Sequence, residues 1–312
     1  MRRTRRAARP KGPTTAAEGL LLVDKPAGVS SHDVVAVARR TLGEKRIGHA
    51  GTLDPFATGL LVLLLGRATR LIQYLPDEPK VYEAVVRLGQ ETDTEDAGGV
   101  VVREAPLPTA AALEAARERL VGTIAQVPPA YSAKHVDGKR AYQLARRGVD
   151  LVLAPVDVTV NALELSGFET TDAGTVSRCR MRVECGGGMY VRSLARDLAR
   201  AAGSAAHLET LRRHGAGVFT LARAIPYERL RDGTPPVSIA PSIDALEGLP
   251  LQPLDGGEVA AVTRGIDIEA RVAGAYAALV EAGGHGALVA FAERVETTSG
   301  DRWQPRVVMR DA

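Results

Sequence analysis

The sequence is centred on the stretch GHAGTLDPFATG at residues 48–59, which runs directly into the apolar segment LLVLLL at residues 60–65. Glycine tolerates positive φ and close backbone approach, so its recurrence beside a proline predicts a constrained loop. The apolar segment has the length of a buried strand and is too short to cross a membrane. Asp54 is the single acid of the loop. A carboxylate on a rigid loop is a candidate catalytic group, and the simpler interpretation is an aspartate that caps a turn.

Composition sets the class of protein. A chain of 312 residues has room for one large domain and a small one. With 45% hydrophobic and 25% charged residues, it has the composition of a soluble globular protein. The formal net charge is +3, and residues 1–11 carry five arginines and Lys11 without any acid. Such a tail can touch phosphates or stay solvated, and we expect residues 1–18 to be disordered.

The cysteines and the N-terminus indicate the compartment. Cys179 and Cys185 have the spacing of neither a zinc ribbon nor a disulfide framework, and they share one face of an alternating strand. Core packing in a reducing cytoplasm is the expected role. No continuous hydrophobic region follows the N-terminal arginines, so a secretory or twin-arginine signal is not expected.

Hydrophobic periodicity predicts alternating strands and helices. Ser30 or Ser31 is expected to cap a helix whose apolar positions are Val34, Val35, Ala38 and Leu42. Other predicted helices cover residues 109–121 and 140–147 and begin near Gly66 and Met189, and predicted strands cover residues 19–23, 60–65, 80–89, 156–160 and 177–185.

An arginine stripe follows the bend at residues 186–188. Arg192, Arg196 and Arg200 recur every four residues on one predicted helix. Such a stripe is most often a solvated face, and we assign that role to Arg196 and Arg200. Arg192 lies one turn into the helix beside the bend, which makes it a candidate site residue.

The acidic loop at residues 92–99 offers a different interpretation. Asp93, Glu95 and Asp96 could serve a metal-dependent hydrolase. The spacing does not match a calcium-binding loop, and no histidine cluster accompanies these acids. The sequence therefore predicts no metal site here.

Segments along most of the chain resemble the TruB family of tRNA pseudouridine synthases. The family's catalytic GTLDP motif is matched at residues 51–55, with Ala50 where the family usually has threonine. That change removes a hydroxyl and keeps the acid. The other matching segments are DKPAGVSS at residues 24–31, the tyrosine, strand and LGQETDT at residues 82–94, GMYVRS at residues 188–193, and the leucine and arginine pair at residues 211–213.

The resemblance implies an α+β fold, the pseudouridine synthase fold, with a mixed, mainly antiparallel central sheet flanked by helices. It implies a catalytic domain over residues 19–247 and a small, β-rich, PUA-like RNA-binding domain over residues 248–312. The composition of residues 234–250, rich in Pro, Ser and Gly, suggests a linker between them.

The resemblance also implies an activity, the isomerisation of uridine to pseudouridine at position 55 in the T-loop of tRNA. Asp54 would attack a flipped-out uridine at C1′, at C6 or through a glycal, and Arg192 would favour the ionised form of Asp54. Tyr82 would be the stacking platform. The remaining implied substrate-binding residues are His49, which would fill the gap left by the flipped base, Tyr190, Leu211 as an apolar wall, and Lys25 at the family's lysine.

The implied partner is the T-stem-loop of tRNA, bound by a cytoplasmic monomer without cofactor, metal, membrane or protein partner. The alternative is a non-catalytic RNA chaperone on the same fold, which the joint presence of Asp54, Tyr82 and Arg192 disfavours. Lys134 and His135 lie where the family's usual motif is compressed by one residue, so neither receives a role.

Overall fold

The computed structural model describes residues 17–131, 135–136, 139–140, 153–233, 236–283, 286–298 and 300–310. The predicted tail over residues 1–18 falls almost wholly outside this range, as do Lys134, the side chain of His135 and the predicted helix at residues 140–147.

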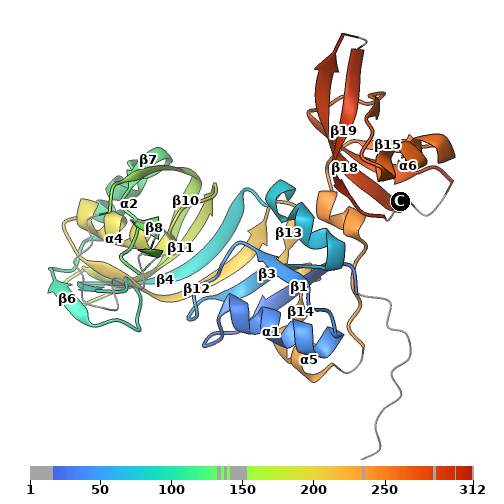
Figure 1. Ribbon diagram of the computed structural model, residues 1–312. Helices are drawn as coiled ribbons and strands as arrows, with labels where there is room; N and C mark the ends of the chain where they lie inside the picture. The colour runs from blue at the N-terminus through green and yellow to red at the C-terminus, as the bar shows by residue number, and fades with distance from the viewer. Residues whose placement is uncertain are drawn as a thin grey trace, which may run out of the picture.

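A long twisted sheet of ten strands forms the larger part of the molecule (Figure 1). The parallel pairs are β1–β14 and β3–β12, and the other neighbours are antiparallel, which confirms the expected mixed, mainly antiparallel sheet. Its path runs through β14 (Ile225–Pro226), β1 (Gly19–Lys25), β3 (Thr58–Leu65), β12 (Ala206–Ala216), β4 (Lys80–Leu88), β11 (Val176–Cys185), β10 (Val156–Thr170) and β7 (Gly122–Gln126), with β2 (Ile47–Ala50) beside β3 and β13 (Phe219–Thr220) beside β12. Two short hairpins form two-stranded sheets of their own, β5 (Gln90–Thr92) with β6 (Val101–Glu104) and β8 (His135–Val136) with β9 (Lys139–Arg140).

The apolar run at residues 60–65 is uninterrupted because β3 is covered on both faces. Leu61, Leu63 and Leu65 pack toward the helices α1 (Ser31–Leu42) and α5 (Tyr227–Asp232). Leu60 and Val62 belong to a second core on the opposite face. The sequence of a strand that is buried on both faces is continuously hydrophobic, whereas a strand buried on one face alternates.

Helix α1 begins where the sequence predicts. Ser30 is its N-cap and forms a capping box with Asp33, and Gly43 ends the helix in the left-handed conformation at φ 68°. The predicted helix at Gly66 is instead a 3₁₀ helix, η1 (Gly66–Tyr74).

Strand β11 shows the predicted alternation. Cys179, Met181, Val183 and Cys185 are buried against α2 (Ala110–Glu118) and α4 (Val191–Ala201). Burial raises the pKa of both thiols to about 12. The cysteines are therefore packing residues, as predicted.

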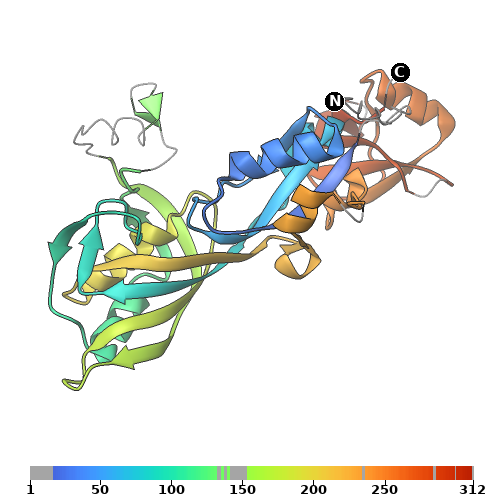
Figure 2. The same ribbon diagram turned by 90° about the horizontal axis from the view of Figure 1, so that it is seen from below.

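A second sheet lies at the C-terminal end of the chain (Figures 1 and 2). Its strand order is β15 (Leu251–Leu254), β17 (Tyr276–Glu281), β18 (Leu288–Thr297), β19 (Gly300–Val308) and β16 (Ile268–Glu269), with helix α6 (Gly256–Thr263) packed against it. This β-rich unit confirms the expected C-terminal domain, while the division at residues 247/248 stays a prediction.

The two sheets share a hydrophobic core. Phe291 of β18 stacks on Tyr74 of η1 with ring centroids 4.2 Å apart. Arg67 of η1 donates a 2.7 Å hydrogen bond to the carbonyl of Met309. The intervening segment includes the short helix η3 (Ser242–Leu246), whose Leu246 is buried in the same core. Part of residues 234–250, the expected linker, therefore packs into this shared core.

Within the described ranges, no helix combines the length and apolar character that a membrane crossing requires.

Candidate active site

The loop that carries Asp54 is fixed from the N-terminal segment. The hydroxyl of Ser31 accepts a 2.9 Å hydrogen bond from the backbone N–H of Leu53 and donates one of 3.1 Å to its carbonyl. The carbonyl of Pro55 accepts a 2.8 Å hydrogen bond from the N–H of Gly28. Bonds on both sides of Asp54 leave its backbone little freedom, which suits a catalytic loop.

Lys25 is hydrogen-bonded to the same loop through the carbonyl of Pro55. Its side chain is fully buried, and its ammonium donates to the carbonyls of Pro26, Val29 and Pro55 at 2.9, 2.6 and 3.3 Å. Burial lowers the pKa of Lys25 to about 8, against the opposing effect of the Asp54 charge. The predicted contact of Lys25 with substrate stays a prediction, since the contacts present join two loops.

Gly59 brings β12 against the loop. Its φ is 102°, and a Cβ there would lie 2.3 Å from the carbonyl oxygen of Arg213. Only glycine permits both the left-handed conformation and this approach. The parallel pairing of Thr58 with Arg212 and Gly59 with Arg213 places the side chains of β12 beside Asp54.

Helix α4 brings the partner of Asp54. Tyr190 is the N-cap of α4, and the side-chain amide of Gln126 makes two hydrogen bonds to its backbone. The amide accepts from the N–H of Tyr190 at 2.9 Å and donates to the carbonyl of Tyr190 at 3.2 Å. Arg192 lies in the first turn, and its Nε donates to Asp54 Oδ2 at 2.8 Å. The expected ion pair is therefore present. The guanidinium of Arg192 is buried, while 36% of the Asp54 side chain is exposed, so the carboxylate is accessible from solvent.

A cavity of about 290 Å³ opens above this ion pair. Of the predicted site residues, Asp54, Tyr82, Tyr190, Arg192 and Leu211 line it. The other lining residues are Gly51, Thr52, Leu53, Lys80, Gly186, Gly188, Met189, Val191 and Arg213.

His49 lies in β2, opposite Leu63, and is not among the lining residues. Its ring makes an edge contact with His32, with centroids 5.5 Å apart. Burial lowers the pKa of His49, with further lowering from His32 and Arg213, so the imidazole is neutral at pH 7. Its role in filling the gap of a flipped base stays a prediction.

Two cations of the cavity wall were not predicted. Arg213 is 1% exposed and donates to the carbonyls of Leu60 and Gly51 at 2.8 and 3.0 Å. Lys80 lies 3.2 Å from Asp77. Lys80 precedes Tyr82 by two positions on β4, so strand period alone could have placed both on one face.

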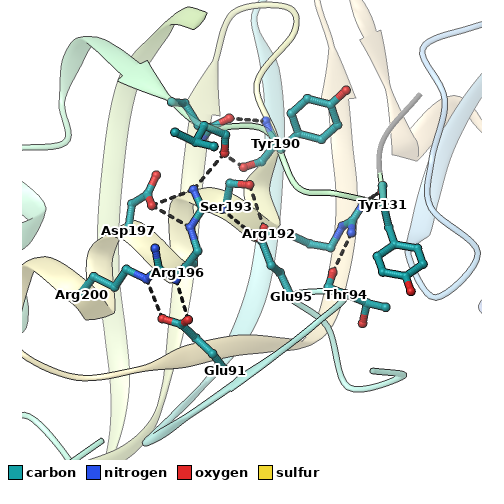
Figure 3. A network of polar contacts seen from close by, with 12 residues as sticks. Glu91, Thr94, Glu95, Tyr131, Tyr190, Arg192, Ser193, Arg196, Asp197 and Arg200 are labelled. Atoms are coloured by element: carbon teal, nitrogen blue, oxygen red, sulfur yellow. Dashed lines mark hydrogen bonds and ion pairs between the residues drawn. The ribbon is translucent and has the colours of Figure 1, made fainter. Parts of the chain in front are cut away.

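The arginine stripe of α4 is largely internal (Figure 3). Arg196 is 7% exposed, pairs with Glu95 and donates to the carbonyl of Val127 at 2.9 Å. Arg200 is half-exposed and makes two 2.7 Å hydrogen bonds to the buried Glu91. The prediction of a solvated face is wrong for Arg196 and incomplete for Arg200, because buried carboxylates pair with both: Glu95, which follows β5, and Glu91, which lies in β5.

Two carboxylates of the acidic loop, those of Asp93 and Asp96, are bound by nearby backbone N–H groups. Asp93 Oδ1 accepts from the N–H of Val100 at 2.8 Å, and Asp96 Oδ1 accepts from the N–H of Gly98 at 2.9 Å. Among the residues that the structure describes, no group of three or more His, Cys, Asp or Glu side chains is arranged to hold a metal.

Comparison with known proteins gives consistent matches. The family model described as "TruB family pseudouridylate synthase (N terminal domain)" matches residues 39–191. A protein of Thermobifida fusca (strain YX) named tRNA pseudouridine synthase B is 44% identical over 253 residues, covering 80% of this chain and 86% of that protein. A protein of the same name from Rhodococcus jostii (strain RHA1) is 44% identical over 269 residues, or 85% and 87% of the two chains.

Solved structures share the fold. The structure titled "Crystal Structure of a Cbf5-Nop10-Gar1 Complex" superimposes with a TM-score of 0.69 at 25% identity and covers 94% of this chain and 85% of that one. The structure titled "Structure of H/ACA RNP bound to a substrate RNA containing 2'-deoxyuridine" gives 0.67 at 24% identity with the same coverage.

Proposed function

Because this chain belongs to the TruB family of pseudouridylate synthases, we propose that it isomerises uridine 55 in the T-loop of tRNA, with Asp54 as the reacting carboxylate. The observation that carries this proposal is the accessible carboxylate of Asp54, which contacts the buried guanidinium of Arg192 at 2.8 Å on the floor of a cavity.

The reaction makes few chemical demands. The N1–C1′ bond breaks, the base rotates, C5 bonds to C1′, and the proton of C5 is lost while N1 regains one. Electrons and atoms balance within the nucleotide, so the step needs an ionised carboxylate beside an unstacked base rather than a redox group. The guanidinium of Arg192 lies 2.8 Å from the Asp54 carboxylate and places a positive charge beside it.

The cavity wall supports a flipped base. Extruding a nucleotide costs a few kcal/mol. Stacking on an aromatic ring returns about 1–3 kcal/mol per base, and two tyrosines, Tyr82 and Tyr190, line the cavity together with the apolar Leu211. Lys80 and Arg213 give the wall a positive charge, which suits a polyanionic RNA.

Tritium release from a T-stem-loop RNA labelled at C5 of uridine tests the proposal. The wild-type protein should release tritium, and Asp54→Asn should lose at least about two to four decades in rate. Asp157→Asn is the matched control, since Asp157 is exposed on β10 away from the cavity. Tritium release by Asp54→Asn at the wild-type rate would refute the assignment, and tight RNA binding without any release by the wild type would favour an RNA chaperone.

We further propose that the chain acts as a cytoplasmic monomer on tRNA, without a metal, cofactor or protein partner. The purified protein alone should be active in EDTA, and its mass in solution should be that of one chain. A requirement for a second protein or for added Mg²⁺ on an unmodified stem-loop would contradict this.

A further inference from the structure

Arg192 is held by three bonds, which leaves its guanidinium a single orientation. Besides Nε on Asp54, Nη1 donates to the carbonyl of Thr94 at 2.7 Å and Nη2 to the carbonyl of Tyr131 at 3.0 Å. The side chain is 4% exposed. Because the guanidinium is planar, the two carbonyls decide where Nε points.

The Thr94 carbonyl belongs to an unusual turn. The next residue, Glu95, has φ 61° and is the sole non-glycine residue with positive φ in the part of the chain that the structure describes. Residues with a long side chain seldom adopt this conformation, and where they do the surrounding structure enforces it. The N–H of Glu95 donates to Thr92 at 3.1 Å, and its carbonyl accepts from Leu208 at 3.1 Å.

The side chain of Glu95 turns back onto α4 (Figure 3). One carboxylate oxygen accepts from the hydroxyl of Ser193 at 2.7 Å, and the other pairs with Arg196. All three side chains are buried. Ser193 and Arg196 follow Arg192 by one and four positions, so the carboxylate grips the helix turn from which Arg192 projects.

We propose that Glu95 is a positioning residue for the reaction. Through its carboxylate it fixes the first turn of α4, and through its left-handed backbone it fixes the Thr94 carbonyl. The helix turn positions the backbone of Arg192, and the Thr94 carbonyl positions its guanidinium. Glu95 therefore holds the guanidinium in contact with Asp54. The inference rests on the proposed function, in which Asp54 is the reacting acid.

Glu91 provides a matched comparison on the same helix. It is a buried carboxylate, and it holds Arg200, two turns beyond Arg192. The Glu91 carboxylate accepts hydrogen bonds from Arg200 and Arg103, whereas the Glu95 carboxylate joins Ser193 and Arg196 beside Arg192. Loss of Glu91 should lower stability, and loss of Glu95 should lower stability and the rate of the chemical step.

The experiment compares single-turnover rates at saturating enzyme with the Kd for a T-stem-loop RNA and with Tm. Glu95→Ala should slow the single-turnover rate about 10–100-fold, since small misplacements in an active site cost up to this much. Its Kd should stay within about threefold of wild type. Glu95→Gln, which keeps an acceptor for Ser193, should recover most of the rate. Glu91→Ala should keep the rate within about threefold despite a lower Tm.

A double-mutant cycle isolates the route through Arg192. In an Arg192→Lys background, Glu95→Ala should slow the reaction by less than about threefold more. Full additivity, or an equal loss of rate in Glu91→Ala, would overturn the proposal. If Glu95→Ala does not fold, Ser193→Ala gives the same comparison, because it removes one of the two contacts that the Glu95 carboxylate makes with α4. An active Asp54→Asn would refute the proposed function instead, whatever the Glu95 variants do.

Discussion

Two cations lie close to Asp54. Arg192 contacts its carboxylate at 2.8 Å. Lys25 is buried on three carbonyls, and its pKa is lowered from the ordinary 10.5 to about 8, chiefly by burial. The Lys25 ammonium, which is bonded to the Asp54 loop, therefore loses its proton at a lower pH than an ordinary lysine.

The lowered pKa of Lys25 predicts that the stability of the folded protein depends on pH. Between pH 8 and 10.5 the unfolded chain binds the Lys25 proton more tightly than the folded protein, so raising the pH through this window stabilises the folded state. Lys25→Met has no such proton. The stability of wild type relative to Lys25→Met should rise by about 1.6 kcal/mol from pH 8 to pH 9.5. Denaturant unfolding at both values measures this, with exposed Lys45→Met as control, and a pH-independent difference would refute it.

The role of the Tyr82 ring is separable from that of its hydroxyl. If Tyr82 is only a platform, Tyr82→Phe should keep most activity because the aromatic face is unchanged. Tyr82→Leu should lose about 1–3 kcal/mol of stacking, or roughly one to two decades in single-turnover rate. If the hydroxyl also removes the C5 proton, Tyr82→Phe should be slower by about two to four decades while binding stays normal. A fully active Leu variant would remove Tyr82 from the site.

At the scale of the element, α4 shows a property that the local sequence does not predict, the burial of a charged side chain. The capping box at Ser30, the alternation of β11 and the apolar run of β3 are local signals, and each predicted its element. Arg196 has its partner Glu95 at a separation of 101 residues, which no local pattern encodes. A charged residue at helical spacing was therefore predicted to be solvated although the fold buries it.

The same reasoning explains which site residues were found. Asp54, Tyr82, Tyr190, Arg192 and Leu211 came from short motifs, and the structure gathers them around one cavity. The burial of Arg213 depends on how β12 pairs with β3, so it could not be predicted from its own segment.

Gln126 gives α4 a testable anchor. Its amide is fully buried and makes two hydrogen bonds to the backbone of Tyr190. Gln126→Ala should lower the free energy of unfolding by about 1–3 kcal/mol, because the backbone groups of Tyr190 lose their partner. Gln304→Ala, which removes a single surface hydrogen bond of 3.2 Å, is the control. Equal stability of the two variants in denaturant unfolding would contradict the anchor.

At the scale of the whole molecule, the shared core predicts that the two sheets unfold in one cooperative transition. The single tryptophan, Trp303, is buried in the C-terminal sheet and reports on that sheet alone. Phe291 lies in the core that both sheets contribute to.

Phe291→Ala should destabilise the protein by about 3–5 kcal/mol, the usual cost of deleting a buried ring. Tryptophan fluorescence and far-ultraviolet circular dichroism should then follow one urea transition, shifted equally for both probes. Val262→Ala, in the core of the C-terminal sheet alone, is the control. Separate transitions for the two probes in the wild type would show that the sheets are independent.

The contact of Gly59 with Arg213 also has a consequence for synthesis of the chain on the ribosome. Arg213 donates to Leu60 across 153 residues of sequence. At about 5–20 residues per second, the ribosome needs on the order of 10–30 s to make that interval. Throughout this interval the Asp54 loop exists without β12, so the nascent chain carries Asp54 long before it carries the cavity that Asp54 and Arg213 line.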